Sequence, residues 1–180
     1  MKPLIQAIKG EVMRRESDFY ITPDEPILAL MNNYHIQNVR TFLEPCAGSG
    51  AISMKMGGRV IQCEIRDSAE GILENWGKVY IGDFLKMPNF EEVDFIITNP
   101  PFSLAKEFID KCLEYQCPVI MLLRLNFLGS QNRHEWWQDK IPSDLLILSK
   151  RPSFTGDGKT DGCEYAWFVW NGIGEGVKVI

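Results

Sequence analysis

The chain has 180 residues, of which 45% are hydrophobic and 24% charged, and it carries a formal net charge of −5 at pH 7. This size predicts one domain, residues 1–180, with a core of its own, and the negative charge argues against tight sequence-independent binding to phosphate backbones. The longest apolar runs have only the length of a strand, so we expect no contact with membranes and a cytoplasmic protein.

Turn and cap residues divide the chain into alternating helices and strands. Thr22 and Pro23 supply a helix cap and a first helical position, and they open a helix near 24–34. Further helices are expected near 51–57, 68–76, 104–115 and 130–139, and the stretch 8–16 has an equivocal helical pattern. Strands are expected near 39–44, 60–65, 79–82, 93–98, 118–124, 144–149 and 163–171.

This order of elements predicts an α/β fold with a seven-stranded, mostly parallel sheet. Strands that alternate with helices pair in parallel through right-handed crossovers, which places helices on both faces of the sheet. The connection 151–162 is too short for a helical crossover, so the last strand should pair antiparallel to the one before it.

Cysteine and histidine give no sign of a stabilising cross-link or metal. The chain has five cysteines, an odd number without a C-x-x-C pair, and only two histidines. We therefore expect neither a disulfide framework nor a bound metal, and we interpret Cys63 and Cys112 as core positions.

A glycine-rich turn follows the first strand. Gly48 and Gly50 permit close approach of a ligand to the backbone, as in nucleotide-binding βαβ units, although such a segment is about as often only a turn. Glu64 stands near the end of the next strand, where a carboxylate can accept hydrogen bonds from ribose hydroxyls. The following strand ends at Asp83 and Phe84, which suit the amine and the ring of an adenine.

The most informative segment is Asn99-Pro100-Pro101-Phe102, at the end of the fourth predicted strand. The carboxamide oxygen of Asn99 and the carbonyl of Pro100 can each accept an N–H from a planar exocyclic amine, and Phe102 can stack on the attached ring. This arrangement suits methylation of an amine. Ligands of an open parallel sheet bind outside the carboxyl ends of its strands, so these strand ends should converge on one crevice.

In chain order, these segments resemble motifs I to IV of the S-adenosylmethionine-dependent amino-methyltransferases, above all those that methylate adenine in DNA. Motif I corresponds to residues 44–50, motif II to Glu64, motif III to 82–84 and motif IV to 99–102. The segment at about 18–34 resembles motif X. The order X, I, IV is the gamma-like one, here in a compact form without a target-recognition domain.

The resemblance implies a Rossmann-like class I methyltransferase fold, S-adenosylmethionine as the cofactor and S-adenosylhomocysteine as the product. It implies catalytic roles for Asn99, Pro100, Pro101 and Phe102. The cofactor-binding residues that it implies are Tyr20, Thr22, Pro23, Glu44, Pro45, Ala47, Gly48, Gly50, Glu64, Asp83, Phe84 and Asn99. Compact enzymes of this kind are familiar from phages, so the resemblance also suggests a phage-like origin.

The glycine-rich loop 151–162 offers a second aromatic surface. Phe154 is similar in position to the aromatic residue of the family's motif VIII, which implies that it faces Phe102 across a base flipped out of its stack. Arg151 and Lys159 could hold a phosphate beside it. The alternative is an ordinary long hairpin loop.

These motifs favour methyl transfer to the exocyclic amine of adenine in DNA. Because predicted elements occupy the region between Phe102 and Phe154, DNA recognition would rest on loops, on a partner or on a second subunit. The same chemistry could act on an RNA base, on cytosine in DNA or on a protein glutamine. A non-catalytic cofactor-binding module is the remaining alternative, and the intact motifs argue against it.

Overall fold

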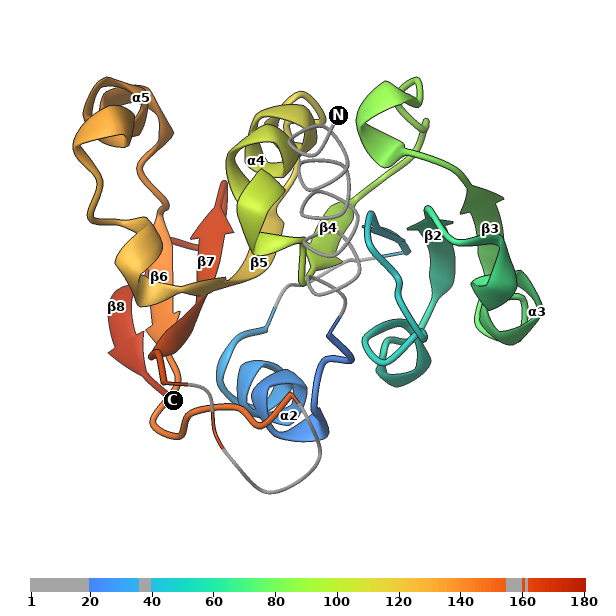
Figure 1. The fold of residues 1–180 in the computed structure, drawn as a ribbon, viewed down its shortest axis with the longest axis horizontal. Helices are drawn as coiled ribbons and strands as arrows, with labels where there is room; N and C mark the ends of the chain where they lie inside the picture. Colours follow the sequence, from blue (N-terminus) through green and yellow to red (C-terminus); the bar gives the residue numbers. More distant parts are fainter. Residues whose placement is uncertain (1–19, 36–39, 155–159, 161) are drawn as a thin grey trace, which may run out of the picture.

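The computed structural model describes residues 20–35, 40–154, 160 and 162–180 (Figure 1). Its strands are β1 (Thr41–Glu44), β2 (Arg59–Glu64), β3 (Lys78–Ile81), β4 (Phe95–Thr98), β5 (Val119–Arg124), β6 (Asp144–Ile147), β7 (Tyr165–Trp170) and β8 (Gly176–Val179). The helices of the described part are α2 (Asp24–Asn33), α3 (Glu70–Leu73), α4 (Ala105–Leu113) and α5 (His134–Lys140), together with short 3-10 turns. The stretch 8–16, the part of the motif X segment before Tyr20 and Lys159 lie outside the described residues.

The eight strands of the described part form one sheet in the order β3-β2-β1-β4-β5-β7-β6-β8. Strands β1 to β5 pair in parallel, β7 pairs antiparallel with both β5 and β6, and β8 runs parallel to β6. The mostly parallel sheet and the antiparallel pairing across the 151–162 loop are confirmed. The number of strands was predicted wrongly, because β8 is a short edge strand of four residues that follows a glycine-rich turn.

Two of the predicted helices are shorter in the structure. Residues 51–57 form only a 3-10 turn over Ser53–Lys55, because Gly57 and Gly58 end the segment and the chain must return at once to β2. Around 68–76 the α-helical part is limited to α3. The helices near 24–34, 104–115 and 130–139 are confirmed as α2, α4 and α5.

The sheet is covered on both faces, as predicted. Figure 1 shows α4 and α5 on one side of the strands and α2 on the other. Phe108 of α4 and Trp137 of α5 pack on one face with Cys63 and Cys112, which are both fully buried. On the other face Ile27 of α2 packs against Trp167, whose indole N–H donates to the backbone carbonyl of Pro26 at 2.8 Å. All six residues of β7 are buried, so this strand contributes to both core layers.

A buried carboxylate ties β8 to the rest of the sheet. Asp144, at the start of β6, is 1% exposed and accepts hydrogen bonds from Tyr34 Oη at 2.8 Å, Ser143 Oγ at 3.0 Å and the backbone N–H groups of Gly174 and Gly176 at 3.2 and 2.8 Å. Burial alone would raise the pKa of Asp144, but these hydrogen bonds outweigh it and hold the pKa below its ordinary value.

Replacing Asp144 should destabilise the fold in a pH-dependent way. Asp144→Asn should lower the free energy of unfolding at pH 7 by about 2–4 kcal/mol, because buried donors lose a charged acceptor. A carboxylate whose pKa is lowered by folding stabilises the protein above its unfolded pKa, about 3.9, and this contribution disappears as the pH falls through the folded pKa. Urea unfolding of the parent and of Asp144→Asn at pH 7, 5 and 3 measures this contribution to the free energy of unfolding. Asp139→Asn, at an exposed position of α5, is the control, and equal pH slopes for parent and Asp144→Asn would contradict this account.

Candidate active site

The turn after β1 is fixed from both sides. Glu44 is 1% exposed, and one oxygen of its carboxyl group accepts hydrogen bonds from the backbone N–H of Ser53 at 2.9 Å and from the Ser53 hydroxyl. Gly48 and Gly50 have φ values of 61° and 79°, in the left-handed region that favours glycine. A Cβ at Gly50 would lie 3.2 Å from the Trp76 ring. The turn therefore requires glycine for its conformation and for space.

The carboxyl group of Glu44 is buried inside this turn and is hydrogen-bonded to it. Burial, together with the negative charge of Glu64, raises the pKa of Glu44 to about 8 in spite of the hydrogen bonds from Ser53. The neighbouring Ala47 donates its backbone N–H to the carbonyl of Cys63 at 2.9 Å, which joins the turn to β2.

Glu64, at the end of β2, lies against the turn. One carboxylate oxygen accepts the backbone N–H of Gly48 at 2.8 Å, and the other accepts the backbone N–H and the Nε of Arg66 at 3.0 and 2.8 Å. The structure thus brings Glu64 and the glycine turn together, as expected. A ribose would have to share Glu64 with Arg66 or displace its side chain.

Asp83 follows β3 on the same edge of the sheet. The backbone N–H of Gly82 donates to the carbonyl of Glu64 at 2.8 Å, and a φ of 143° at Gly82 lets the chain turn there. The Asp83 carboxylate accepts the N–H of Leu85 at 3.2 Å, pairs with Lys86 at 3.0 Å and stays 32% exposed. It is therefore accessible to a ligand.

The structure corrects the role expected for Phe84. Its ring is 2% exposed and stacks on Phe108 with a centroid distance of 5.7 Å, so no face is left for an adenine ring. Ile65, which directly follows Glu64, is an apolar side chain that is exposed at this edge, with 65% of its surface accessible. Sequence analysis did not identify Ile65. Its position directly after a carboxylate at the end of a strand was the pattern that could have indicated it.

Asn99 directly follows β4, and only the nitrogen of its side-chain amide has a hydrogen-bond partner among the described residues. Its Nδ2 donates to Thr22 Oγ1 at 3.1 Å, and Thr22 is 7% exposed. Thr22 was predicted as a helix cap, but α2 begins at Asp24, Pro23 takes the cap position and the Thr22 hydroxyl orients Asn99. Among the described residues Asn99 Oδ1 is buried and has no hydrogen-bond partner. A buried acceptor of this kind is uncommon and suits a donor on a ligand.

Four rings gather beside Asn99, and we call Tyr20, Phe102, Phe154 and Tyr165 the aromatic cluster. The Phe102 centroid lies 6.3 Å from Tyr20, 6.4 Å from Phe154 and 5.6 Å from Tyr165. The guanidinium of Arg124 lies 4.7 Å over the Phe102 ring, and its Nε donates to Tyr165 Oη at 2.9 Å. Neither Arg124 nor Tyr165 was among the site residues predicted from the sequence, and the two are paired across β5 and β7.

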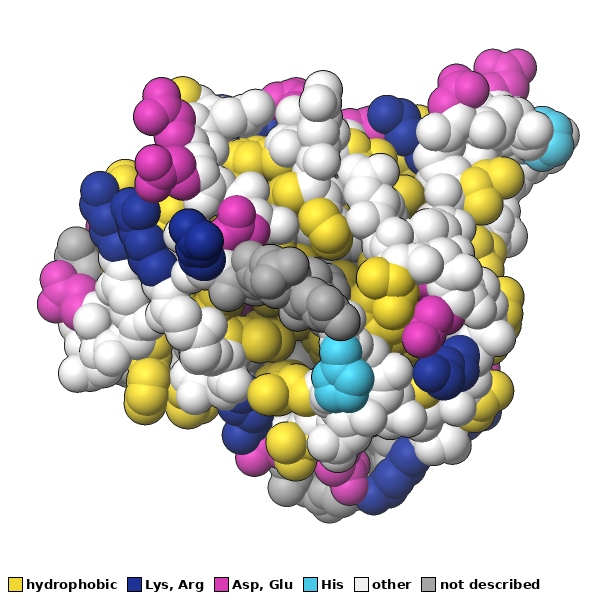
Figure 2. All heavy atoms as spheres, turned by 180° about the vertical axis from the view of Figure 1, so that it is seen from behind, with side chains coloured by type: hydrophobic (Ala, Val, Ile, Leu, Met, Phe, Trp, Pro, Cys, Tyr) yellow, Lys and Arg dark blue, Asp and Glu magenta, His cyan; other side chains and the backbone are white. Residues whose placement is uncertain are grey.

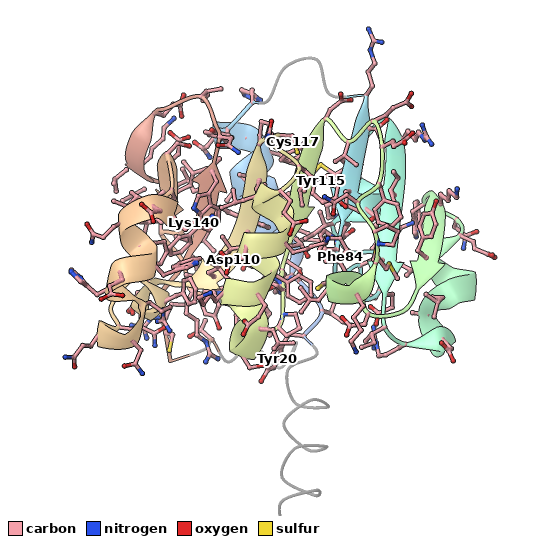
Figure 3. The ribbon with its side chains drawn as sticks, turned by 90° about the horizontal axis from the view of Figure 1, so that it is seen from above. Tyr20, Phe84, Asp110, Tyr115, Cys117 and Lys140 are labelled. Atoms are coloured by element: carbon pink, nitrogen blue, oxygen red, sulfur yellow. The ribbon has the colours of Figure 1, made fainter. Side chains whose placement is uncertain are left out.

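Three further residues that were predicted for the site, Pro100, Pro101 and Arg151, lie around Asn99 and the aromatic cluster or at the surface. Pro100 is buried and Pro101 half-buried, so both anchor the backbone beside Asn99. Arg151 is exposed and pairs with Glu164. Figure 3 shows Tyr20 at the opposite edge of the molecule from Tyr115 and Cys117, which precede β5, so the aromatic cluster lies at the carboxyl ends of the parallel strands.

Two features are absent from the part of the chain that the structure describes. No helix there has the length and apolar character needed to cross a membrane. No group of three or more histidine, cysteine, aspartate or glutamate side chains in these residues is arranged to hold a metal ion.

No protein-family model matches the sequence, and no curated protein matches it significantly. Solved structures do match over most of the chain. An assigned RNA methyltransferase from Pyrococcus horikoshii has 20% identity and a TM-score of 0.64 over 83% of this chain and 84% of that chain. An assigned class I S-adenosylmethionine-dependent methyltransferase from Listeria monocytogenes has 13% identity and a TM-score of 0.64, and the match covers 90% of this chain and 65% of that chain. The methyltransferase subunit of a type I restriction-modification system from Streptococcus thermophilus has 12% identity and a TM-score of 0.60, and the match covers 86% of this chain and 45% of that chain.

This chain therefore spans less than two thirds of the last two proteins. The shared architecture is the Rossmann-like fold of class I methyltransferases, which confirms the predicted fold class.

Gly50→Ala should destabilise the protein by about 1–3 kcal/mol, because it forces a left-handed conformation on alanine and brings a Cβ against Trp76. Gly71→Ala is the matched control, since a Cβ there meets nothing within 4 Å. It should change the free energy of unfolding by less than about 1 kcal/mol. Denaturant unfolding followed by tryptophan fluorescence compares the two, and equal stabilities would show that the turn tolerates a side chain.

Proposed function

We propose that this protein transfers a methyl group from S-adenosylmethionine to the exocyclic amino group of adenine in DNA. The observation that carries the proposal is the buried, unpartnered Oδ1 of Asn99 beside the aromatic cluster. An acceptor next to aromatic rings suits a planar amine attached to a ring. The class I methyltransferase fold supports a methyl group as the group transferred.

The residues at the ends of β1, β2 and β3 fit the cofactor. The accessible Asp83 carboxylate would accept the adenine amine, Glu64 the ribose hydroxyls, and the exposed Ile65 would lie against the adenine ring. The backbone of the turn at Gly48 would approach the methionine end. When bound, S-adenosylmethionine supplies a methyl group on a positively charged sulfur, which needs no further activation.

The protein's own part in the reaction is to hold and polarise the amine. Asn99 Oδ1 and the Pro100 carbonyl accept its two N–H groups, which leaves the nitrogen lone pair directed at the methyl group. Positive charge that develops on the nitrogen is stabilised by these two oxygens and by a ring face of Phe102. Arg124 already lies over this ring, so we assign the amine to the face that the guanidinium leaves open. The proton passes to water after transfer.

DNA is the proposed substrate because the order of motifs resembles that of the DNA adenine methyltransferases. An RNA base, a DNA cytosine or a protein glutamine remain alternatives with the same amine chemistry. On the back of the molecule, lysine and arginine side chains gather at one side with acidic side chains next to them (Figure 2). This mixed charge attracts phosphates weakly, so we propose that a partner or a second subunit helps to present the DNA.

The proposal is tested by incubating the protein with isotopically labelled S-adenosylmethionine and separate pools of DNA, RNA and protein. Mass spectrometry of the digested products should find N6-methyladenine in the DNA pool. Label in the RNA or protein pool alone would identify one of the alternatives. Cofactor binding without label in any pool would indicate a non-catalytic module.

Asn99→Ala should abolish most methyl transfer while it preserves cofactor affinity. We expect kcat/KM to fall by about three orders of magnitude, because this acceptor interacts most strongly as charge develops on the amine. Initial rates and calorimetric titration with S-adenosylmethionine measure the two effects. Near-normal turnover in the variant would disprove the assigned role of Asn99.

Asp83→Ala should weaken S-adenosylmethionine binding by about 1–3 kcal/mol, the cost of leaving a hydrogen-bonding group unpaired. Its thermal stability should change little, because the Asp83 carboxylate is partly exposed and its ion pair with Lys86 lies at the surface. Asp139→Ala, on the exposed face of α5, is the matched control. Equal affinities for these two variants would remove Asp83 from the cofactor site.

A further inference from the structure

A base held between two aromatic rings needs two nearly parallel surfaces, and the aromatic cluster offers one such pair. The Tyr20 ring is inclined by 27° to that of Phe102, with centroids 6.3 Å apart. Phe154 meets the same Phe102 ring almost edge-on, at 72°, and Tyr165 is tilted by 55°. Phe154 therefore does not present the facing surface that its position in the sequence implied.

We propose that Tyr20, and not Phe154, forms the wall of the target-base pocket opposite Phe102. The proposal rests on the proposed function, because only a nucleobase has two faces to cover. It also assigns Tyr20 to the substrate, whereas sequence analysis placed this residue at the cofactor.

A base would lie between the rings of Tyr20 and Phe102. Carbon atoms in contact lie about 3.5–4.0 Å apart, so a planar base between two rings requires roughly 7 Å. The ring centroids of Tyr20 and Phe102 lie 6.3 Å apart, so the two rings must move apart before a base can enter between them. Tyr20 is half-buried and lies in the irregular segment before α2, outside the sheet, so its movement breaks no strand pairing.

A hydrogen bond links this wall to the catalytic amide. Thr22, two residues after Tyr20, accepts the hydrogen bond from Asn99 Nδ2 that leaves Oδ1 unpaired. One short segment thus orients the acceptor for the amine and places a ring beside it. A base that enters between Tyr20 and Phe102 would carry its amine toward Asn99.

The other members of the cluster support these two rings from the side. Phe154 lies 5.6 Å from Tyr20 and 5.2 Å from Tyr165, tilted against both. Arg124 holds Phe102 through its ring face and Tyr165 through a hydrogen bond. Phe154 is accordingly a positioning residue that packs against the wall.

The test compares Tyr20→Leu with Phe154→Leu on the nucleic acid that the parent protein methylates, as duplex and as single strand. Tyr20→Leu should raise the KM for the duplex on the order of ten- to a hundredfold, with less effect on the single strand, where less stacking is lost on flipping. Phe154→Leu should raise the KM for the duplex less than Tyr20→Leu does. Tyr20→Phe keeps the ring and should restore the KM.

Two controls separate substrate binding from other effects. S-adenosylmethionine affinity, measured by calorimetry, should be unchanged in Tyr20→Leu. Tyr115→Leu makes the same replacement at the opposite edge of the molecule (Figure 3) and should leave the KM unchanged, with thermal unfolding confirming that each variant is folded.

The outcomes distinguish this inference from the proposed function. A larger KM effect for Phe154→Leu than for Tyr20→Leu, or a loss of cofactor affinity in Tyr20→Leu without a change in KM, overturns the inference and leaves nucleobase methylation intact. Methylation of protein amides but not of nucleic acid, or no methylation at all, overturns both.

Discussion

The hydrogen bond between Asn99 Nδ2 and Thr22 Oγ1 joins two residues 77 positions apart and determines the geometry of the site. It fixes the amide plane, so that Oδ1 remains a buried acceptor without a partner in the described part of the chain. Such an acceptor costs about 1–3 kcal/mol. The strand before it can hold this unfavourable arrangement because β4 is paired on one side with β1 and on the other with β5. Under the proposed function the penalty is relieved when an amine binds, which favours the occupied site.

The antiparallel insertion of β7 brings the aromatic cluster to the same edge. A parallel strand would present its last residue where β5 ends, but β7 runs the other way and presents its first residue, Tyr165. The register pairs Tyr165 with Arg124, the last residue of β5. This pairing explains how a guanidinium reaches both Tyr165 and the Phe102 ring. The loop before β7 then places Phe154 beside them, far in sequence from the motif that ends β4.

Much of this architecture follows from local sequence patterns. Apolar runs bounded by turn residues indicate where strands end, and parallel pairing brings those ends to one edge. The position of Gly48, Glu64, Asp83 and Asn99 at successive strand ends could therefore be predicted, as could the helices on both faces. The edge strand β8 could not, because four residues after a glycine-rich turn carry too little pattern and their pairing depends on the buried Asp144.

Side-chain direction was decided only by the tertiary structure. Glu64-Ile65 and Asp83-Phe84 are the same local pattern, a carboxylate followed by an apolar residue at a strand end, yet Ile65 is 65% exposed and Phe84 is 2% exposed. The difference arises because Phe108 of α4 stacks on Phe84, a contact between residues distant in sequence. The nearly parallel alignment of Tyr20 with Phe102 also depends on residues distant in sequence. The sequence by itself determined which residues stand at the ends of the strands, whereas packing between remote elements decided which of those side chains are buried and which are exposed.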